Sequence, residues 1–249
     1  MTGSHDSDCG NRRAFFTRVS AGVALLALAP GVRLIDLAVG KDNAQPASGD
    51  VRWGMFVDTT RCAEGCTDCV DACNKEHGLH GLGRPDTDAQ WIRKLNLKDE
   101  RTGQTWSLPM MCQHCEKPPC VDVCPTGASF VREDGIVLVD KHTCIGCRYC
   151  MMACPYKARS FIHEDLSHQR PHSPRGKGTV ESCNFCVQRV DNGNQPACVQ
   201  ACSEAGHNAL VFGDLNDGES TVSKRLAAMQ STQVRDDLGL NTAVRYHGV

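Results

Sequence analysis

The sequence lacks a basic surplus, a long apolar run and a normal share of aromatic residues, and each absence excludes a class of protein. Its 27 Lys and Arg stand against 29 Asp and Glu, a formal net charge of -2. A basic surface for nucleic acid is therefore excluded, and no nucleic-acid partner is expected. No segment reaches the roughly 20 consecutive apolar residues of a membrane span. Aromatic residues make up 5% of the chain, so something besides a hydrophobic core must help to hold the fold.

Several cofactor motifs are absent as well. The sequence contains no C-x-x-C-H for haem attachment, no G-x-G-x-x-G for a dinucleotide and no G-x-x-x-x-G-K-[ST] for a nucleotide phosphate. What the chain does contain is cysteine, at 17 positions among 249 residues. The composition therefore predicts a protein that is organised by cysteine chemistry.

The N-terminal residues 1–40 have the order of an export signal. The pair Arg12-Arg13 precedes two phenylalanines and an apolar run over residues 19–29, which breaks at Pro30. A charged front, a short apolar middle and an adjacent arginine pair are typical of a twin-arginine signal, so we expect a periplasmic or extracytoplasmic location. The alternative is an N-terminal cytosolic helix with a chance arginine pair. The cleavage site stays open, and an uncut signal would tether the protein to the membrane.

Apart from Cys9, which precedes the apolar run, the cysteines fall into four groups of four. These groups are Cys62, Cys66, Cys69, Cys73; Cys112, Cys115, Cys120, Cys124; Cys144, Cys147, Cys150, Cys154; and Cys183, Cys186, Cys198, Cys202. The third group is C-x2-C-x2-C-x3-C-P, the run by which bacterial ferredoxins bind [4Fe-4S] clusters, and its fourth cysteine ligates the other cluster of a pair. Four groups therefore predict four clusters, each closed by a cysteine from another group.

Three other interpretations compete with this one, of which buried free thiols would show no regular spacing. Exported proteins form disulfides, but cysteines two residues apart are badly placed to pair with each other. Structural zinc uses two C-x2-C pairs separated by a spacer, whereas this chain has runs of four. The first and last groups depart from the simplest spacing. Cys62 and Cys66 are one residue too far apart, and eleven residues separate Cys186 from Cys198.

The segments between the groups predict short strands and turns. Residues 52–58 and 209–212 have strand composition, and residues 129–139 predict a hairpin about Asp134-Gly135. A second hairpin is expected over residues 91–108, about Thr102-Gly103. The fold class predicted is α+β, with two double-cluster ferredoxin-like modules, small hairpins and short helices. The cluster domain is expected at residues 51–215 with residues 110–160 as the inserted inner module, followed by a helix and tail at residues 216–249.

These residues also carry a family resemblance. The run Met111-Cys112-Gln113-His114-Cys115-Glu116-Lys117-Pro118-Pro119-Cys120 and the run from Cys144 to Tyr156 resemble the four-cluster electron-transfer subunits of dimethyl sulfoxide reductase-type complexes. Within that family, residues 52–55, residues 62–66 and residues 212–217 are most similar to the exported ferredoxin-type subunit of the Dsr membrane complex of sulfur-metabolising prokaryotes. The resemblance implies a quinone-interacting integral membrane subunit, a multihaem cytochrome c and further iron–sulfur subunits as partners.

The resemblance also implies which cysteines bind each cluster. The Cys62 site takes Cys62, Cys66, Cys69 and Cys202, and the Cys183 site takes Cys183, Cys186, Cys198 and Cys73. The Cys112 site takes Cys112, Cys115, Cys120 and Cys154, and the Cys144 site takes Cys144, Cys147, Cys150 and Cys124. The extra residue before Cys66 leaves the cluster type at the Cys62 site open.

Three functions are weighed from the sequence. The first is an electron-transfer subunit of a sulfur-metabolism complex, or of a polysulfide, nitrite or dimethyl sulfoxide reductase or a hydrogenase. The second is a catalytic reductase, and the third is a disulfide-rich exported binding module. Each predicted cluster has four thiolates and leaves no iron open to substrate, so the chain is not expected to be an enzyme alone.

Histidines and charged residues near the cysteine groups are not expected to bind metal. His114 is expected to pack beside a cluster or donate a hydrogen bond to it. Exposed positions are expected for His77, His80, His163, His168, His172, Arg148, Lys157 and Arg159. Glu64, Asp68 and Asp71 surround the first group whereas Lys141 and Arg148 flank the third, so the Cys62 cluster is predicted to be harder to reduce than the Cys144 cluster.

Overall fold

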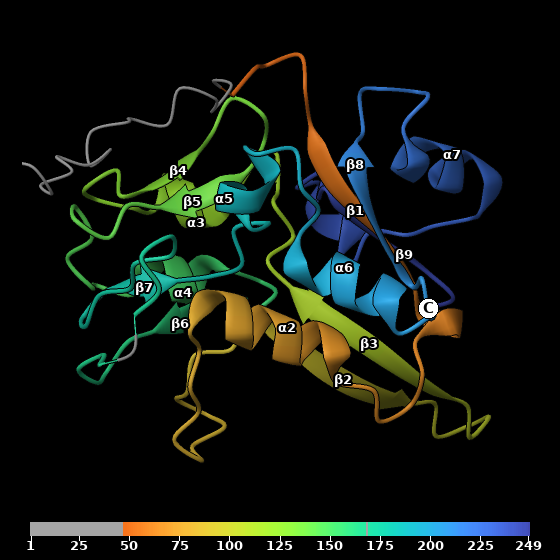
Figure 1. Cartoon of the computed structure of the whole chain (residues 1–249), viewed down its shortest axis with the longest axis horizontal. Helices are drawn as coiled ribbons and strands as arrows, with labels where there is room; N and C mark the ends of the chain where they lie inside the picture. Colours follow the sequence, from red (N-terminus) through yellow and green to blue (C-terminus); the bar gives the residue numbers. More distant parts are fainter. Residues whose placement is uncertain (1–46, 168) are drawn as a thin grey trace, which may run out of the picture. The chain divides into compact units, whose positions relative to one another are not determined.

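The computed structural model describes residues 47–167 and 169–249. These residues belong to one compact unit, shown in Figure 1. The signal expected at residues 1–40 and the exposure expected for His168 both lie outside the described residues. Short strands and short helices alternate along the unit, so the fold is α+β as the sequence predicted.

A three-stranded sheet carries the largest part of the hydrophobic core. Strand β1 (Trp53–Asp58) lies between β8 (Leu210–Asp214) and β9 (Val244–His247), antiparallel to β8 and parallel to β9 (Figure 1). Met55 pairs with Phe212 on one side and with Val244 on the other. The first two strands match the expected segments, whereas β9 was not foreseen in the tail.

Two helices and a long hairpin complete this part of the molecule, which we call the sheet region. Helix α2 (Asp68–His77) packs against α6 (Ala197–Glu204) and against β2 (Ile92–Lys98). Strand β2 pairs with β3 (Thr105–Met111), and Gly103 has a φ of 72°, a conformation that glycine adopts without strain. This confirms the hairpin predicted about Thr102-Gly103.

A second part of the chain, residues 119–181, forms what we call the inner region. It contains α3 (Pro119–Asp122), the hairpin of β4 (Ser129–Val131) and β5 (Val137–Val139), α4 (Tyr149–Ala153), and the paired strands β6 (Ser160–Phe161) and β7 (Val180–Glu181). Helices α3 and α4 contact each other. Gly135 has a φ of 84°, which confirms the expected hairpin turn.

The remaining elements are short. They are the 3-10 helices η1 (Thr59–Arg61) and η2 (Asp236–Leu238), together with α5 (Val187–Val190) and α7 (Thr221–Ala228). Helix α7 begins at Ser220, whose hydroxyl accepts a hydrogen bond from the Ser223 amide and so satisfies one of the free N–H groups of the first turn. Helix α7 packs on β8 and β1. Within residues 47–167 and 169–249, no helix has both the length and the apolar character that crossing a membrane requires.

Candidate metal centres in the cysteine-rich core

All sixteen grouped cysteines are free thiols, and the fold buries most of them. Eleven are buried, four are partly buried, and Cys147 is exposed. No disulfide joins any of these sixteen side chains, which argues against the disulfide-rich binding module. Free thiols in such numbers are unusual in a core unless they ligate a metal.

Helices α2 and α6 explain how the outer cysteine groups mix. Cys69 and Cys73 are four residues apart on α2, and Cys198 and Cys202 are four residues apart on α6, so each pair lies on one face of its helix. The two helices pack together through these faces, with all four cysteines buried. One end of the helix pair therefore brings Cys69 to Cys202, and the other brings Cys73 to Cys198.

The small cavities in the core and the causes of the raised cysteine pKa values give the same groupings. Cys62, Cys66, Cys69 and Cys202 line one small cavity together with Lys94. Burial raises the pKa of Cys73 well above its usual value, and the nearby thiols of Cys183, Cys198 and Cys186 raise it further. The last cysteine of each outer group thus lies with the other outer group.

The inner groups exchange their last cysteines in the same way. Cys124 lines a small cavity with Cys144, Cys147 and Cys150. On the other side, burial raises the pKa of Cys115 to about 12, and Cys112, Cys120 and Cys154 are the thiols near enough to add to that rise. These proximities match the four sets that the resemblance implied, and ligation of a cluster by each set stays a prediction.

Local backbone structure accommodates the two irregular spacings. The extra residue between Cys62 and Cys66 forms a turn in which Gly65 has a φ of 74° and the Cys66 amide donates to the Ala63 carbonyl at 3.3 Å. Cys66 still reaches the same cavity as Cys69. The long gap before Cys198 is filled by α5 and the turn that follows it. Neither irregularity separates a cysteine from its quartet.

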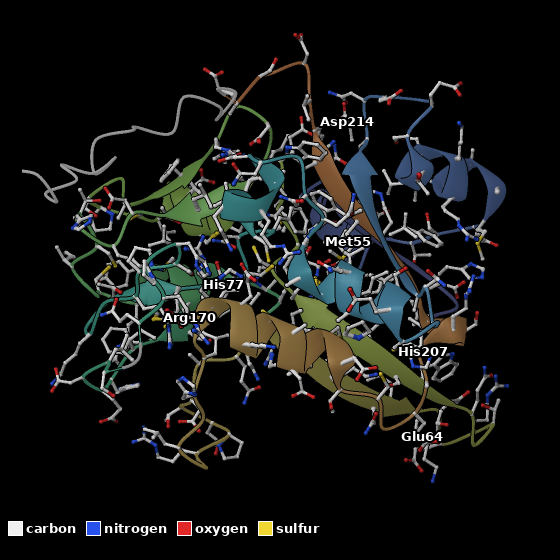
Figure 2. The ribbon with its side chains drawn as sticks, in the orientation of Figure 1. Met55, Glu64, His77, Arg170, His207 and Asp214 are labelled. Carbon is white, nitrogen blue, oxygen red and sulfur yellow. The ribbon has the colours of Figure 1, made fainter. Side chains whose placement is uncertain are left out.

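A lysine, an arginine and a histidine nitrogen each lie within hydrogen-bond distance of a cysteine sulfur, one at each of three sites. Lys94 Nζ lies 3.1 Å from Cys62 Sγ, and Arg159 Nη2 lies 3.1 Å from Cys120 Sγ. His77 Nε2 lies 3.2 Å from Cys186 Sγ, and Figure 2 labels it at the end of α2. At the Cys144 site the sulfur of Cys124 accepts from the Ser129 amide at 3.4 Å.

The exposed positions expected for His77 and Arg159 are wrong. Their exposed fractions are 1% and 5%. His77 lies four residues after Cys73, so it continues the buried face of α2, and this periodicity is a signal that the sequence did contain. Burial lowers the pKa of His77 to about 3, which keeps the imidazole neutral near pH 7. Arg148, Lys157, His80, His163 and His172 are exposed as expected.

His114 lies in the buried core, and its expected place beside a cluster stays a prediction. Its ring is buried and stacks on Phe185 with 3.7 Å between centroids. Nδ1 accepts a hydrogen bond from the Val137 amide at 3.0 Å, so the proton is on Nε2, which has no acceptor among the described residues. An imidazole with one nitrogen already used and the other free to donate suits a hydrogen bond to a cluster.

The charges near the sites differ from those that the sequence suggested. Lys141 donates to the Pro174 carbonyl at 2.7 Å and lies over the Trp91 ring, and Arg148 stacks on Phe161. The Cys62 site, which was expected to be surrounded by acidic residues, also has Lys94 on its sulfur. The predicted order of the cluster potentials therefore stays a prediction. The charge of Lys94 has to be counted with the acidic residues at the Cys62 site.

The quartets fit iron–sulfur clusters rather than isolated metal ions. Each brings four free thiols together, and buried N–H groups of His114 and Arg159 have no acceptor among the described residues. A cube of iron and sulfide presents several acceptor sulfurs to such donors, whereas a single tetrahedral ion presents only its ligands. The fold and these sites define a ferredoxin-type iron–sulfur protein.

Comparison with known proteins places the chain more narrowly. Residues 104–214 match the family model of a 4Fe-4S dicluster domain. The chain is 39% identical to Hdr-like menaquinol oxidoreductase iron-sulfur subunit 1 of Archaeoglobus fulgidus, over 95% of this chain and 97% of that protein. It is 37% identical to a subunit of the tetrathionate reductase of Salmonella typhimurium, over 80% and 74% of the two chains. It is also 36% identical to the protein NrfC of Escherichia coli, over 96% and 95%. The protein belongs to this family of 4Fe-4S ferredoxin-type iron–sulfur subunits.

Proposed function

We propose that this protein is an electron-transfer subunit that carries four [4Fe-4S] clusters within a membrane-associated redox complex. The observation that carries the proposal is the gathering of sixteen free cysteines into four quartets, each of which takes one cysteine from a different sequence group. The ligands are the members of the Cys62, Cys183, Cys112 and Cys144 sites. When bound, the clusters supply one-electron redox centres whose potentials depend on burial, hydrogen bonds to sulfur and nearby charge.

The proposed domain arrangement follows the quartets. Residues 51–215 bear all the ligands, and residues 110–160 form the inserted inner module. Residues 216–249 supply a helix and, through β9, the third strand beside β1. Each quartet is complete, so the chain has no open coordination position to offer a substrate and acts as a carrier rather than as an enzyme.

The partners proposed are a quinone-interacting integral membrane subunit, a multihaem cytochrome c and other iron–sulfur subunits of a sulfur-metabolism complex of Dsr type. The chain would then be its DsrO subunit. A relative named as a menaquinol oxidoreductase subunit, similar over 97% of its own length, supports a quinone-linked partner. The iron–sulfur subunit of a tetrathionate, nitrite or dimethyl sulfoxide reductase is the alternative.

Iron analysis tests the cofactor proposal. Anaerobically purified protein should contain about four irons and four acid-labile sulfides for each quartet. Stoichiometric zinc with little iron would sink the iron–sulfur proposal. Co-purification with membrane partners, followed by a redox titration monitored by electron paramagnetic resonance, tests the carrier role. Reduction of tetrathionate, nitrite or dimethyl sulfoxide by the isolated chain would instead favour a catalytic reductase.

We also propose export by the twin-arginine route, which carries folded proteins and so suits a chain whose clusters are inserted in the cytoplasm. Replacing Arg12 and Arg13 by lysine should retain the protein in the cytoplasm, as judged by fractionation. Replacing Arg33 by lysine, outside the arginine pair, is the matched control and should leave export unchanged. Equal periplasmic recovery of both variants would contradict the proposal.

A further inference from the structure

Arg159 is a buried cation that lies among cysteine sulfur atoms. It immediately precedes β6, and only 5% of its surface is exposed. Nη2 donates to Cys120 Sγ at 3.1 Å. The Nε and Nη1 groups have no acceptor within residues 47–167 and 169–249. A guanidinium has five N–H donors in a rigid planar arrangement, so most of its hydrogen-bonding capacity is still free inside the protein.

The surroundings of Arg159 belong to two different sites. Cys120 of the Cys112 site and Cys150 of the Cys144 site lie in one small buried cluster, so the guanidinium that donates to Cys120 is close to both sites. Cys120, Cys112 and Cys150 favour its positive charge and raise the pKa of Arg159 against the effect of burial. The same guanidinium in turn stabilises the thiolate forms of Cys120 and Cys150. Arg159 therefore lies within electrostatic reach of both inner sites.

Arg175, the other arginine buried in the described part of the chain, and half-buried Arg132 differ from Arg159 in one respect. Arg175 pairs with the Glu181 carboxylate, and Arg132 pairs with Asp134 and Asp191. Arg159 makes no ion pair with a carboxylate in the described part of the chain. A buried charge without a counter-charge is strongly unfavourable, and arginine does not lose its proton in a protein. The sulfur-rich inner sites are the available counter-charge.

We propose that Arg159 is a positioning residue shared by the two inner clusters, and that its charge and its free N–H groups make both of them easier to reduce. The inference rests on the proposed function, because it needs iron–sulfur clusters at both inner sites. Each added electron makes a cluster more negative, and a nearby cation favours that state. Because Arg159 is buried, its effect is screened by salt much less than that of an exposed charge.

The test compares Arg159→Met with Lys94→Met in the full-length protein. Both variants remove one cation that contacts a cysteine sulfur, but Lys94 contacts only the Cys62 site. Midpoint potentials would be measured by redox titration with electron paramagnetic resonance at low and high salt. For Arg159→Met we expect the equilibrium constants of two one-electron reduction steps to fall at least tenfold. Each of the two midpoint potentials then falls by about 59 mV. For Lys94→Met we expect one midpoint potential to fall, by a smaller amount, and this fall to become smaller still in high salt.

Arg159→Lys supplies the conservative variant, because it keeps the charge but loses the planar set of donors. Arg159→Lys should restore part of the midpoint potential that Arg159→Met loses at both inner sites. If Arg159→Met does not retain its iron, Arg159→Lys and Arg159→Gln carry the comparison, and the charged variant should hold the higher pair of potentials. Equal potentials in the charged and neutral variants would overturn the inference, as would a shift confined to one step.

Iron content separates this inference from the proposed function. Wild-type protein without iron and sulfide would mean that the cluster proposal itself fails. Fully loaded wild-type and variant proteins with four unchanged midpoint potentials would leave the clusters in place and reject the role of Arg159. The two failures are therefore distinguished by one chemical analysis.

Discussion

The sheet region and the inner region bury their cysteines in different surroundings. The large hydrophobic cluster contains residues of β1, β8 and β9 together with Trp91 and Phe185. Its buried cysteines are Cys69, Cys73, Cys183, Cys198 and Cys202 of the outer sites and Cys112, Cys115 and Cys154 of the Cys112 site. The small cluster consists of Cys120, Val137, Cys150 and Val180, with four partly buried neighbours. Near it, Ile145, Tyr149 and Met152 are exposed.

This difference indicates that metal ligation by cysteine contributes more to the stability of one region than to that of the other. Burial of apolar side chains stabilises by about 25 cal/mol for each Å² removed from water, so the sheet region has a source of stability besides metal. In the small cluster of the inner region two of the four buried members are themselves cysteines. Its short helices and strands therefore depend more on metal ligation, as in other small metal-binding domains.

Removal of iron should have the largest effect and tests this contrast most directly. After anaerobic chelation, we expect amides of α3, α4, β4 and β5 to lose hydrogen-exchange protection while those of β1 and β8 keep much of theirs. The physical reason is that binding free energy of the metal is also folding free energy where the core is small. Equal loss of protection in both regions would contradict the contrast.

The second largest effect is expected at a buried ion pair of the inner region whose arginine also bonds to the sheet region. Arg175 donates to the Glu181 carboxylate through Nε and Nη2, and it donates to the Gly78 carbonyl at the end of α2 through Nη1. Both side chains are almost fully buried. Glu181→Gln leaves an uncompensated buried charge, which costs about 3–5 kcal/mol in the free energy of unfolding.

The matched control for Glu181→Gln is Lys177→Met, which breaks the exposed pair of Lys177 with Asp165. An exposed pair contributes only about 0–1 kcal/mol. Chemical denaturation of both variants, with iron bound, measures the difference. If the two substitutions cost the same, the buried pair does not stabilise the fold as described.

A smaller effect is expected from Gly146→Ala in the Cys144 site. Gly146 has a φ of 70°, and a Cβ there would meet the Gly178 carbonyl oxygen. Left-handed conformation alone costs a non-glycine residue about 1–2 kcal/mol, and the backbone contact adds to that. Gly127→Ala is the control, because Gly127 has a similar φ of 68° but open space around its Cα. Iron retention and unfolding midpoints should fall further for Gly146→Ala than for the control.

The smallest effect is expected in the sheet region, at Tyr246. Its hydroxyl donates to the Pro109 carbonyl at 3.2 Å and accepts from Gln113 Nε2 at 3.0 Å. Tyr246 therefore links β9 to β3 and to Gln113. Tyr246→Phe removes these bonds but keeps the ring, at a cost of about 1 kcal/mol in unfolding free energy. Tyr149→Phe on the exposed side of α4 should cost less, and thermal unfolding compares the two. A larger loss for the exposed variant would be inconsistent with this packing.

Much of the fold and the cysteine grouping could be predicted because they depend on local spacing. The two turns at Thr102-Gly103 and Asp134-Gly135 contain glycines at positive φ, and each closes a hairpin between neighbouring strands. The i, i+4 spacing of Cys69 and Cys73 places them on one helix face whatever surrounds the helix. Strand β9 was missed because residues 244–247 pair with β1, nearly two hundred positions earlier, and no local pattern encodes that partner.

The sequence by itself determined that sixteen cysteines form four groups, that short strands and helices separate them, and that the family is one of ferredoxin-type subunits. These properties follow from residue types and from distances along the chain. Only the tertiary structure decided which charged groups accompany the sulfur atoms. Lys94 and Arg159 are 32 and 39 positions away from Cys62 and Cys120, the cysteines that they contact, so sequence proximity could not assign them. The electrostatic potential at a buried site depends on distances in space, and folding sets those distances.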